Sequence, residues 1–274
     1  MTGRQKIGGI FALVCLFPLL VIFFIPAEQI QAIIQKALAQ QGYTFTAGRF
    51  GKAFPLGISA SDVTIADSRG PLVKFDRFNL RPAFIPLLTG NLALSANASV
   101  GSGTIAALWR SGTSGGISAD ISGLSLEQVP FFRTAAGATV KGILRGEARL
   151  TGVTPRMNGV IKLEVKGAEL SELKIGEMPL PAVTDETIQG MLRVRDGRGR
   201  VESLTFEGSG LYARLSGEVP LSASAPLDLI LELMPKADFL EKQKLVFLLL
   251  VRFLDSPGHY RIPVRGTLAK PSLF

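Results

Sequence analysis

The one group of residues in this chain whose types would suit acid–base chemistry lies near the C-terminus. Asp255, Ser256 and His259 stand within five residues, and His259 is the only histidine. An acid, a hydroxyl and an imidazole are the components of a hydrolase triad, but a triad requires a defined geometry. Pro257 and Gly258 between them are turn-forming residues. We therefore predict a turn here and assign no catalytic residue, so an enzyme is not expected. A hydrolase that uses His259 with Asp255 or Ser256 is the alternative hypothesis.

Metal and cofactor chemistry has little support in the sequence. Cys15 is the only cysteine and lies in an apolar run, which excludes a disulfide framework and indicates ordinary packing. Asp185 and Glu186 are the only two acidic residues that are adjacent in the sequence. Pro179 and Pro181 before them predict a loop. No cluster has the spacing of metal ligands. The sequence therefore predicts no metal site and no cofactor.

A basic group surrounds the dipeptide Asp196-Gly197, a signal for a β-hairpin turn. It consists of Arg193, Arg195, Arg198 and Arg200, and the chain as a whole carries a formal net charge of +8. The pattern is compatible with a phosphate-binding patch, but alternating charges beside a turn are also typical of a solvated hairpin tip, which we favour.

The N-terminal sequence predicts a membrane anchor. Residues Ile7 to Ile25 carry no charge and follow Arg4 and Lys6. Nineteen helical residues span roughly 28 Å, close to the thickness of a bilayer core. A cleaved signal peptide is the alternative, but the run is long and lacks a small-residue cleavage motif. We expect a cytoplasmic segment 1–6, a transmembrane anchor 7–26 and an exported remainder, which argues against a nucleic-acid partner.

The exported part begins with a short helix and continues as strands. Apolar residues recur at helical spacing from Ile30 to Leu38, which predicts an amphipathic helix over 27–42. Beyond it, residues 43–274 follow the period of two that is typical of strands. The clearest alternations are 92–100, 140–150, 157–165, 188–194, 211–219, 227–233 and 260–268. We expect about ten strands in an antiparallel meander with short turns.

Two features of the strand pattern concern the shape of the sheet. The alternation slips by one residue between Ile58/Ala60 and Val63/Ile65, and again between Val73/Phe75 and Phe78/Leu80, as at a bulge or bend. One face of the segment 92–100 is wholly apolar, and its residues are Leu92, Leu94, Ala96, Ala98 and Val100. With too little helix to cover it, such a face must close on itself, meet a partner or hold apolar ligands. These five residues are therefore our candidate apolar groove.

Two segments depart from the strand pattern. Gly101 to Gly116 is rich in glycine and serine, and we expect a mobile connection there. Lys236 to Leu254 contains the apolar run Leu245 to Val251 between basic residues, too short to cross a bilayer. We expect a C-terminal helix packed on the sheet, with a position in a membrane interface as the alternative.

The chain resembles a family of inner-membrane proteins along nearly its whole length. The similarity is carried by LAQQGYTFTAGRF (38–50), FPLGISASDVTI (54–65), the segment 70–105, ISGLSLEQVPFFRTAAGATVKGILRGEARLTG (121–152) and GHYRIPVRGTLAKPSLF (258–274). These stretches resemble the AsmA-like proteins and, more narrowly, the type II secretion system protein N family. The motifs are patterned strands and turns without a catalytic signature.

The resemblance implies a location, a fold and two functions. It places the chain in the bacterial inner membrane as a single-pass protein with its β-rich domain, 43–274, in the periplasm. It implies a long curved antiparallel sheet, either an open groove or a partly closed barrel. The first implied function is an accessory role in type II secretion, with other secretion subunits as partners. The alternative is an AsmA-like lipid-binding or lipid-transfer protein with phospholipid as the partner.

Overall fold

The computed structural model describes residues 26–54, 57–83, 86, 91–112, 115–153, 156–172, 174–175, 178–179, 183–208, 210–220, 226–267 and 270–272. The predicted cytoplasmic segment 1–6 and Cys15 lie outside these residues, as does the predicted anchor 7–26 except for Pro26. Within the described ranges, no helix has both the length and the apolar character needed to cross a membrane.

The described chain is mainly β-structure. Its strands are β1 (Thr44–Thr46), β2 (Arg49–Ala53), β3 (Gly57–Asp67), β4 (Gly70–Pro82), β5 (Ala93–Val100), β6 (Gly103–Arg110), β7 (Gly116–Ser125), β8 (Thr139–Val153), β9 (Arg156–Ser171), β10 (Lys174–Ile175), β11 (Met178–Pro179), β12 (Val183–Arg195), β13 (Arg198–Glu207), β14 (Leu211–Pro220), β15 (Asp228–Pro235), β16 (Leu254–Ser256), β17 (His259–Thr267) and β18 (Lys270–Ser272). The helices are α2 (Ala27–Ala39), α4 (Phe131–Ala136), α5 (Ala237–Lys242) and α6 (Lys244–Leu249), with 3-10 turns η1 (Leu126–Gln128) and η2 (Val251–Phe253).

The strands form a meander, as the short predicted turns indicate. Sixteen described strands belong to one antiparallel sheet, in which β3 to β9 follow in chain order and continue through β12, β13, β14, β15 and β17. Strands β10 and β11 form a separate hairpin. The prediction of about ten strands was too low, because it did not separate several short edge strands and missed β6.

The sheet is open. One edge consists of β1 and β2, both paired with β3, and the other consists of β16 and β18, both paired with β17. Among the described strands no ladder joins these two edges, so the sheet does not close into a barrel. Both edges are made of short, interrupted strands.

The prediction of a mobile connection over Gly101 to Gly116 was wrong for residues 103–110, which form a strand. This strand is β6, which lies between β5 and β7. Gly101 adopts a positive φ of 55° in the tight turn that joins β5 to β6. Gly103 passes so close to the backbone of Leu124 that a side chain would not fit. The glycines therefore serve a turn and a close approach of strands inside a sheet.

The helices agree with the prediction in part. Helix α2 is confirmed within the expected 27–42, and Ile30, Ile34 and Leu38 on its apolar side are half-buried while Ile33 is exposed. The single helix expected over 236–254 is instead two short helices followed by η2. The helical path breaks at Gln243, whose backbone has φ −117° and ψ 30°. Helix α4 was not predicted.

The backbone is irregular at the first position where the sequence pattern slips. Asp62 has a left-handed φ of 54°, and Ala60 and Val63 on either side of it are both buried. Ladder registers also shift in β7–β8, β8–β9, β9–β12, β12–β13 and β13–β14. Bulges increase the local twist, so a series of them across neighbouring strands curls the sheet.

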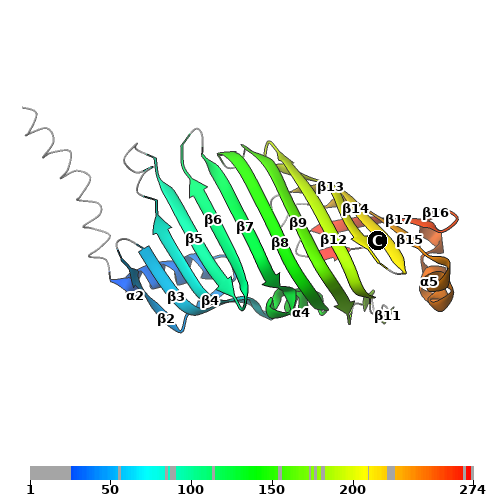
Figure 1. The fold of residues 1–274 in the computed structure, drawn as a ribbon, viewed down its shortest axis with the longest axis horizontal. Helices are drawn as coiled ribbons and strands as arrows, with labels where there is room; N and C mark the ends of the chain where they lie inside the picture. Colours follow the sequence, from blue (N-terminus) through cyan, green and yellow to red (C-terminus); the bar gives the residue numbers. More distant parts are fainter. Residues whose placement is uncertain are drawn as a thin grey trace, which may run out of the picture.

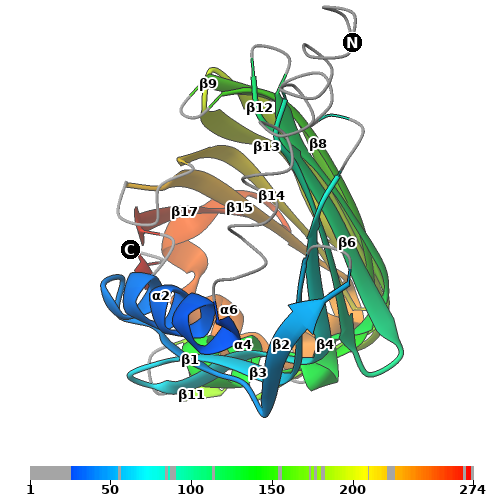
Figure 2. The ribbon, with the colours of Figure 1, turned by 90° about the vertical axis from the view of Figure 1, so that its left-hand side faces the viewer.

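The curl is visible from the end of the molecule that carries α2 (Figure 2). Strands β3 and β4 lie at the bottom, β6 and β8 rise on the right, β12 and β13 form the top, and β14, β15 and β17 turn back inward. Helices α2, α4 and α5 all lie along one rim, the lower one in Figure 1. On that rim the Thr134 hydroxyl of α4 donates to the Pro71 carbonyl, at 2.6 Å, beside the β3–β4 turn.

The close approach of β8 and β9 at Gly159 gives a test of the fold. A Cβ at Gly159 would overlap the carbonyl oxygen of Arg149, whereas one at Gly51, in edge strand β2, would meet no atom within 4 Å. We expect Gly159→Ala to lower the free energy of unfolding by about 2 kcal/mol and Gly51→Ala to change it by less than ~0.5 kcal/mol. Chemical unfolding followed by the fluorescence of Trp109, the only tryptophan, measures both. Equal effects of the two substitutions would contradict the strand pairing.

Candidate functional site

Strand β5 contains four of the five residues predicted to share an apolar face. Leu94, Ala96, Ala98 and Val100 alternate along it, while Leu92 precedes the strand. The Leu92 side chain is 42% exposed, and its amide donates to the Ser111 hydroxyl at 2.9 Å. The structure therefore brings four of the five residues onto one face of β5 and leaves Leu92 at the end of that face.

The register of the neighbouring strands extends this face. Ala96 lies opposite Leu80 of β4 and Ala107 of β6, and Ala98 lies opposite Phe78 and Ile105. Directly opposite residues in an antiparallel ladder point to the same side of the sheet. The apolar side of β5 is thus continuous with apolar sides of β4 and β6.

The same pairing continues across the rest of the sheet. The residues that follow from β6 onward are almost all aliphatic or aromatic: Ile117, Ala119 and Ile121 on β7; Leu144, Ala148 and Leu150 on β8; Ile161, Leu163 and Val165 on β9; Ile188, Leu192 and Val194 on β12; Leu204 and Phe206 on β13; Ala213 and Leu215 on β14; Leu229, Leu231 and Leu233 on β15; Tyr260, Ile262 and Val264 on β17. We call this continuous surface, from β4 to β17, the apolar face.

Helices cover the apolar face near one end. Phe247 and Leu250 of the α5–α6 segment are buried with Tyr260 and Ile262 of β17. The Phe247 ring lies 5.2 Å from that of Tyr260, measured between centroids. Because α6 packs on the apolar face and lies inside the curl in Figure 2, the apolar face is the concave one.

Strands β5 and β6, near the other end of the apolar face, have less cover. A second buried cluster joins Leu126 to Val140 and Val165, with Phe132 of α4 against it. On β5 and β6, by contrast, Leu94, Ala96, Ala98, Ile105 and Ala107 are only half-buried, and Trp109 is 38% exposed. Aliphatic area that stays half-exposed on a concave surface is the chemical setting for an apolar ligand.

The opposite, convex face of the sheet is polar and ion-paired. The Arg149 guanidinium donates to both carboxylate oxygens of Asp120, at 3.1 and 3.0 Å, and this hydrogen bonding raises the pKa of Arg149. The Lys141 ammonium donates to Glu169 at 2.7 Å, which likewise raises the pKa of Lys141. Both bases therefore remain charged at neutral pH, and both pairs are exposed, so they add little to stability.

The four predicted arginines lie together on this convex face. Asp196 and Gly197 have φ values of 48° and 75°, which confirms the hairpin turn between β12 and β13. Arg195 stands opposite Arg198 and Arg193 opposite Arg200, so like charges face each other across the strands. The bulge at Glu202 partly offsets this repulsion, because the Glu202 carboxylate accepts from Arg193 at 2.6 and 3.3 Å.

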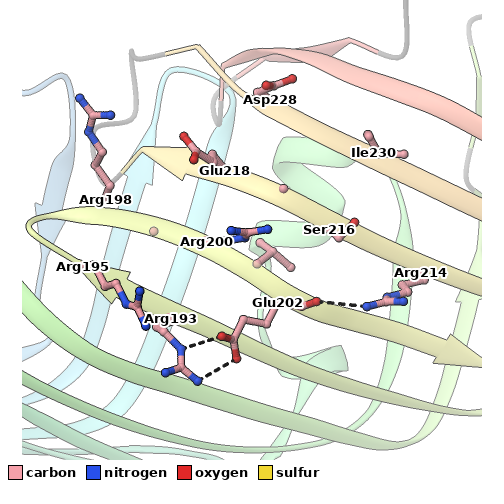
Figure 3. Close-up of a pocket in the computed structure, with 13 residues that line it drawn as sticks. Arg193, Arg195, Arg198, Arg200, Glu202, Arg214, Ser216, Glu218, Asp228 and Ile230 are labelled. Carbon is pink, nitrogen blue, oxygen red and sulfur yellow. Dashed lines mark hydrogen bonds and ion pairs between the residues drawn. The ribbon is translucent and has the colours of Figure 1, made fainter.

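These arginines line a shallow cavity of about 850 Å³ (Figure 3). Arg214 adds a fifth guanidinium, which donates to the Glu202 carbonyl at 3.5 Å, and Glu218 and Asp228 complete the polar lining. The cavity lies on the side of the sheet away from the apolar face. Mixed charges of this kind suit solvent or a polar partner and do not suit an acyl chain.

The structure brings together two members of the Asp255-Ser256-His259 group. His259 Nδ1 lies 3.4 Å from Asp255 Oδ2, and Pro257 and Gly258 form the predicted turn, which joins β16 to β17. The other imidazole nitrogen, Nε2, is buried and has no hydrogen-bond partner among the described residues. In this arrangement Ser256 does not accept or donate a hydrogen bond at Nε2.

The prediction of a loop at Asp185-Glu186 was wrong. Both residues belong to β12, and Glu186 is fully buried, with 0% exposure. Gly208 makes room for its carboxylate, because a Cβ at that position would overlap both carboxylate oxygens. In the described ranges, no group of three or more His, Cys, Asp or Glu side chains has the arrangement of a metal site.

Comparisons with known proteins found no matching family model, no matching curated protein and no matching solved structure.

The sequence analysis did not predict how far the apolar face extends. We identified one strand of it, β5, as a candidate groove, whereas the ladder registers join β5 to apolar residues on ten other strands. A strand pattern was present in the segment that we interpreted as a mobile connection: apolar residues stand at every second position, at Ile105, Ala107 and Trp109. This alternation could have predicted β6.

Proposed function

We propose that the apolar face binds the acyl chains of membrane lipids. The observation that carries this proposal is a continuous aliphatic surface on the concave side of an open sheet, only half-buried at β5 and β6. An acyl chain needs no hydrogen bonds and matches such a surface in chemistry. Each methylene removed from water contributes roughly 0.8 kcal/mol, so about ten of them supply on the order of 8 kcal/mol before the costs of association.

The open edge of the sheet favours lipids over compact apolar ligands. A lipid has a charged or polar headgroup whose transfer into an apolar site is costly. In an open curl the chains contact the concave face while the headgroup stays in water. A closed barrel would require the whole molecule to enter.

The resemblance to AsmA-like proteins supports the same function. It adds the proposal that the chain acts at the bacterial inner membrane as a single-pass protein, with the sheet in the periplasm, and takes part in lipid binding or lipid transfer between membranes.

A second candidate is the accessory role in type II secretion that the resemblance implies. The observation that favours it is edge strand β2, five residues long, which pairs with β3 and with no other described strand. An unpaired edge accepts a strand from a partner by main-chain hydrogen bonding. Strand β6, in the glycine-rich segment, offers no such edge, because it lies between β5 and β7.

Two neighbouring alanines of β6 test the lipid proposal. Ala107 belongs to the apolar face, opposite Ala96 and Ala119, whereas Ala106 is exposed on the convex face, opposite Asn97 and Asp120. A carboxylate against acyl chains is costly. We therefore expect Ala107→Glu to reduce the phospholipid that copurifies with the protein at least about tenfold, equivalent to ~1.4 kcal/mol.

Mass spectrometry of extracted lipid, normalised to protein, measures this loss, and Ala106→Glu is the matched control. Equal lipid content in both variants, or no lipid in the unsubstituted protein, would contradict the proposal. Circular dichroism is used to check that both variants keep the sheet.

Gly51 of β2 serves to test the secretion candidate, because a side chain there meets no atom within 4 Å. A photo-reactive residue at Gly51 should give adducts with secretion-platform subunits in cells. The same residue at Ala106, on an internal strand, is the control. Adducts of the same kind and amount at both positions, or none at Gly51, would contradict strand addition at this edge.

A further inference from the structure

Helix α6 and turn η2 have two apolar sides, and the fold uses only one of them. The inner side packs on the sheet: Phe247 is 5% exposed and Leu250 is 7% exposed, in a cluster with Tyr260 and Ile262. Phe239 of α5 closes this cluster, with its ring centroid 6.2 Å from that of Phe247. The contacts of this inner side hold α6 and η2 against the sheet.

The outer side exposes an unusual amount of aliphatic surface. Leu245 is 76% exposed, Leu248 65%, Leu249 62% and Val251 52%, and all four lie within seven residues. Single exposed leucines are normal on proteins, but a contiguous group of large aliphatic side chains marks a contact surface. We call these four residues the outer leucine cluster, although its last member is valine.

Basic residues flank the outer leucine cluster. The segment from Lys242 to Phe253 contains Lys242, Lys244 and Arg252 and no acidic residue, and all three bases are exposed. The guanidinium of Arg252 lies 4.6 Å from the centroid of the Phe253 ring. The nearest carboxylates along the chain, Asp238, Glu241 and Asp255, lie outside this segment. Aliphatic side chains bordered by lysine and arginine are typical of segments that lie in the interface of a membrane containing anionic lipid.

The position of the cluster in the fold agrees with a flat apolar partner. Helices α2, α4 and α5 lie along the same rim of the sheet in Figure 1, and α6 follows α5 directly. Two of these helices also expose a large apolar side chain, Ile33 at 66% on α2 and Phe131 at 46% on α4.

We propose that the outer leucine cluster inserts into the headgroup–acyl interface of an anionic phospholipid bilayer, with Lys242, Lys244 and Arg252 at the headgroups. The charge of the flanking residues selects a bilayer over a second copy of this positively charged chain. The inference goes beyond the proposed function, because it concerns where the domain meets a membrane and does not require lipid on the apolar face.

Lipid quenching of a site-specific fluorophore tests this insertion in the full chain. Replacing Cys15 by serine leaves one introduced cysteine for the label, placed at Leu248→Cys or, as a control, at Met234→Cys. Met234 is 40% exposed on neighbouring strand β15 but does not belong to the outer leucine cluster. The protein is reconstituted in vesicles of phosphatidylethanolamine and phosphatidylglycerol that contain spin-labelled lipid. We expect several-fold stronger quenching at Leu248 than at Met234.

Two results would overturn the proposal. Equal, weak quenching at both positions would show that the cluster faces water. A blue-shifted emission at Leu248 without lipid quenching would show that protein covers the cluster. A third label at Ala107→Cys reports on the apolar face separately, so a failure of membrane docking is distinguished from a failure of lipid binding there.

Substitutions of the cluster and its flanks complete the test. With the label at Leu248→Cys, the pair Leu245→Ser and Leu249→Ser should abolish most of the quenching with little change in the melting temperature, since these side chains are mostly exposed. Phe247→Ala, on the inner side, should lower the melting temperature. Replacing Lys242, Lys244 and Arg252 by glutamine should weaken quenching in phosphatidylglycerol vesicles. Unchanged quenching in these variants would overturn the roles given to the leucines and the bases.

Discussion

The alternation of side chains along paired strands is the constraint on which this structure depends. Residues directly opposite in an antiparallel ladder share a face, so an apolar residue at every second position, kept in register, produces one continuous apolar surface. Here that surface extends from β4 to β17. A one-residue slip in any ladder would turn its side chains to water. The bulges prevent this: at Glu202 the extra residue keeps both Val201 and Leu204 on the apolar face.

The curl and the distribution of helices are consequences of that surface. The four described helices are too short to cover so many strands, and the sheet reduces its exposed apolar area by bending around the concave side. The α5–α6 segment closes one end through Phe247 and Tyr260, and α4 contacts the rim near β4 and β8. Between β4 and β8, the apolar residues Leu94, Ala96, Ala98, Ile105 and Ala107 of β5 and β6 remain half-buried. The charged convex face, with its bidentate Arg149–Asp120 pair, keeps the other side of the sheet in water.

Local sequence patterns predicted much of the fold, but they did not predict contacts between residues that are far apart in the sequence. Alternation identified β5, β8, β9, β12 and β17, and helical spacing identified α2. The positive φ at Asp62 occurs where the alternation slips. Glycine content misled the interpretation of Gly101 to Gly116, because a glycine required by a close neighbouring strand looks the same in sequence as one in a loop. The burial of Glu186 depends on the space left by Gly208, more than twenty residues away in the sequence. The residues next to Glu186 therefore do not predict its burial.

The central claim is that lipid chains contact the concave side of the sheet, and in-cell photo-crosslinking at two adjacent residues of β5 tests it most directly. A photo-reactive residue at Ala96 lies on the apolar face, and one at Asn97 lies on the convex face. Our account predicts a phospholipid adduct at Ala96 and none at Asn97. The absence of a lipid adduct at Ala96, or equal lipid adducts at both positions, would contradict it.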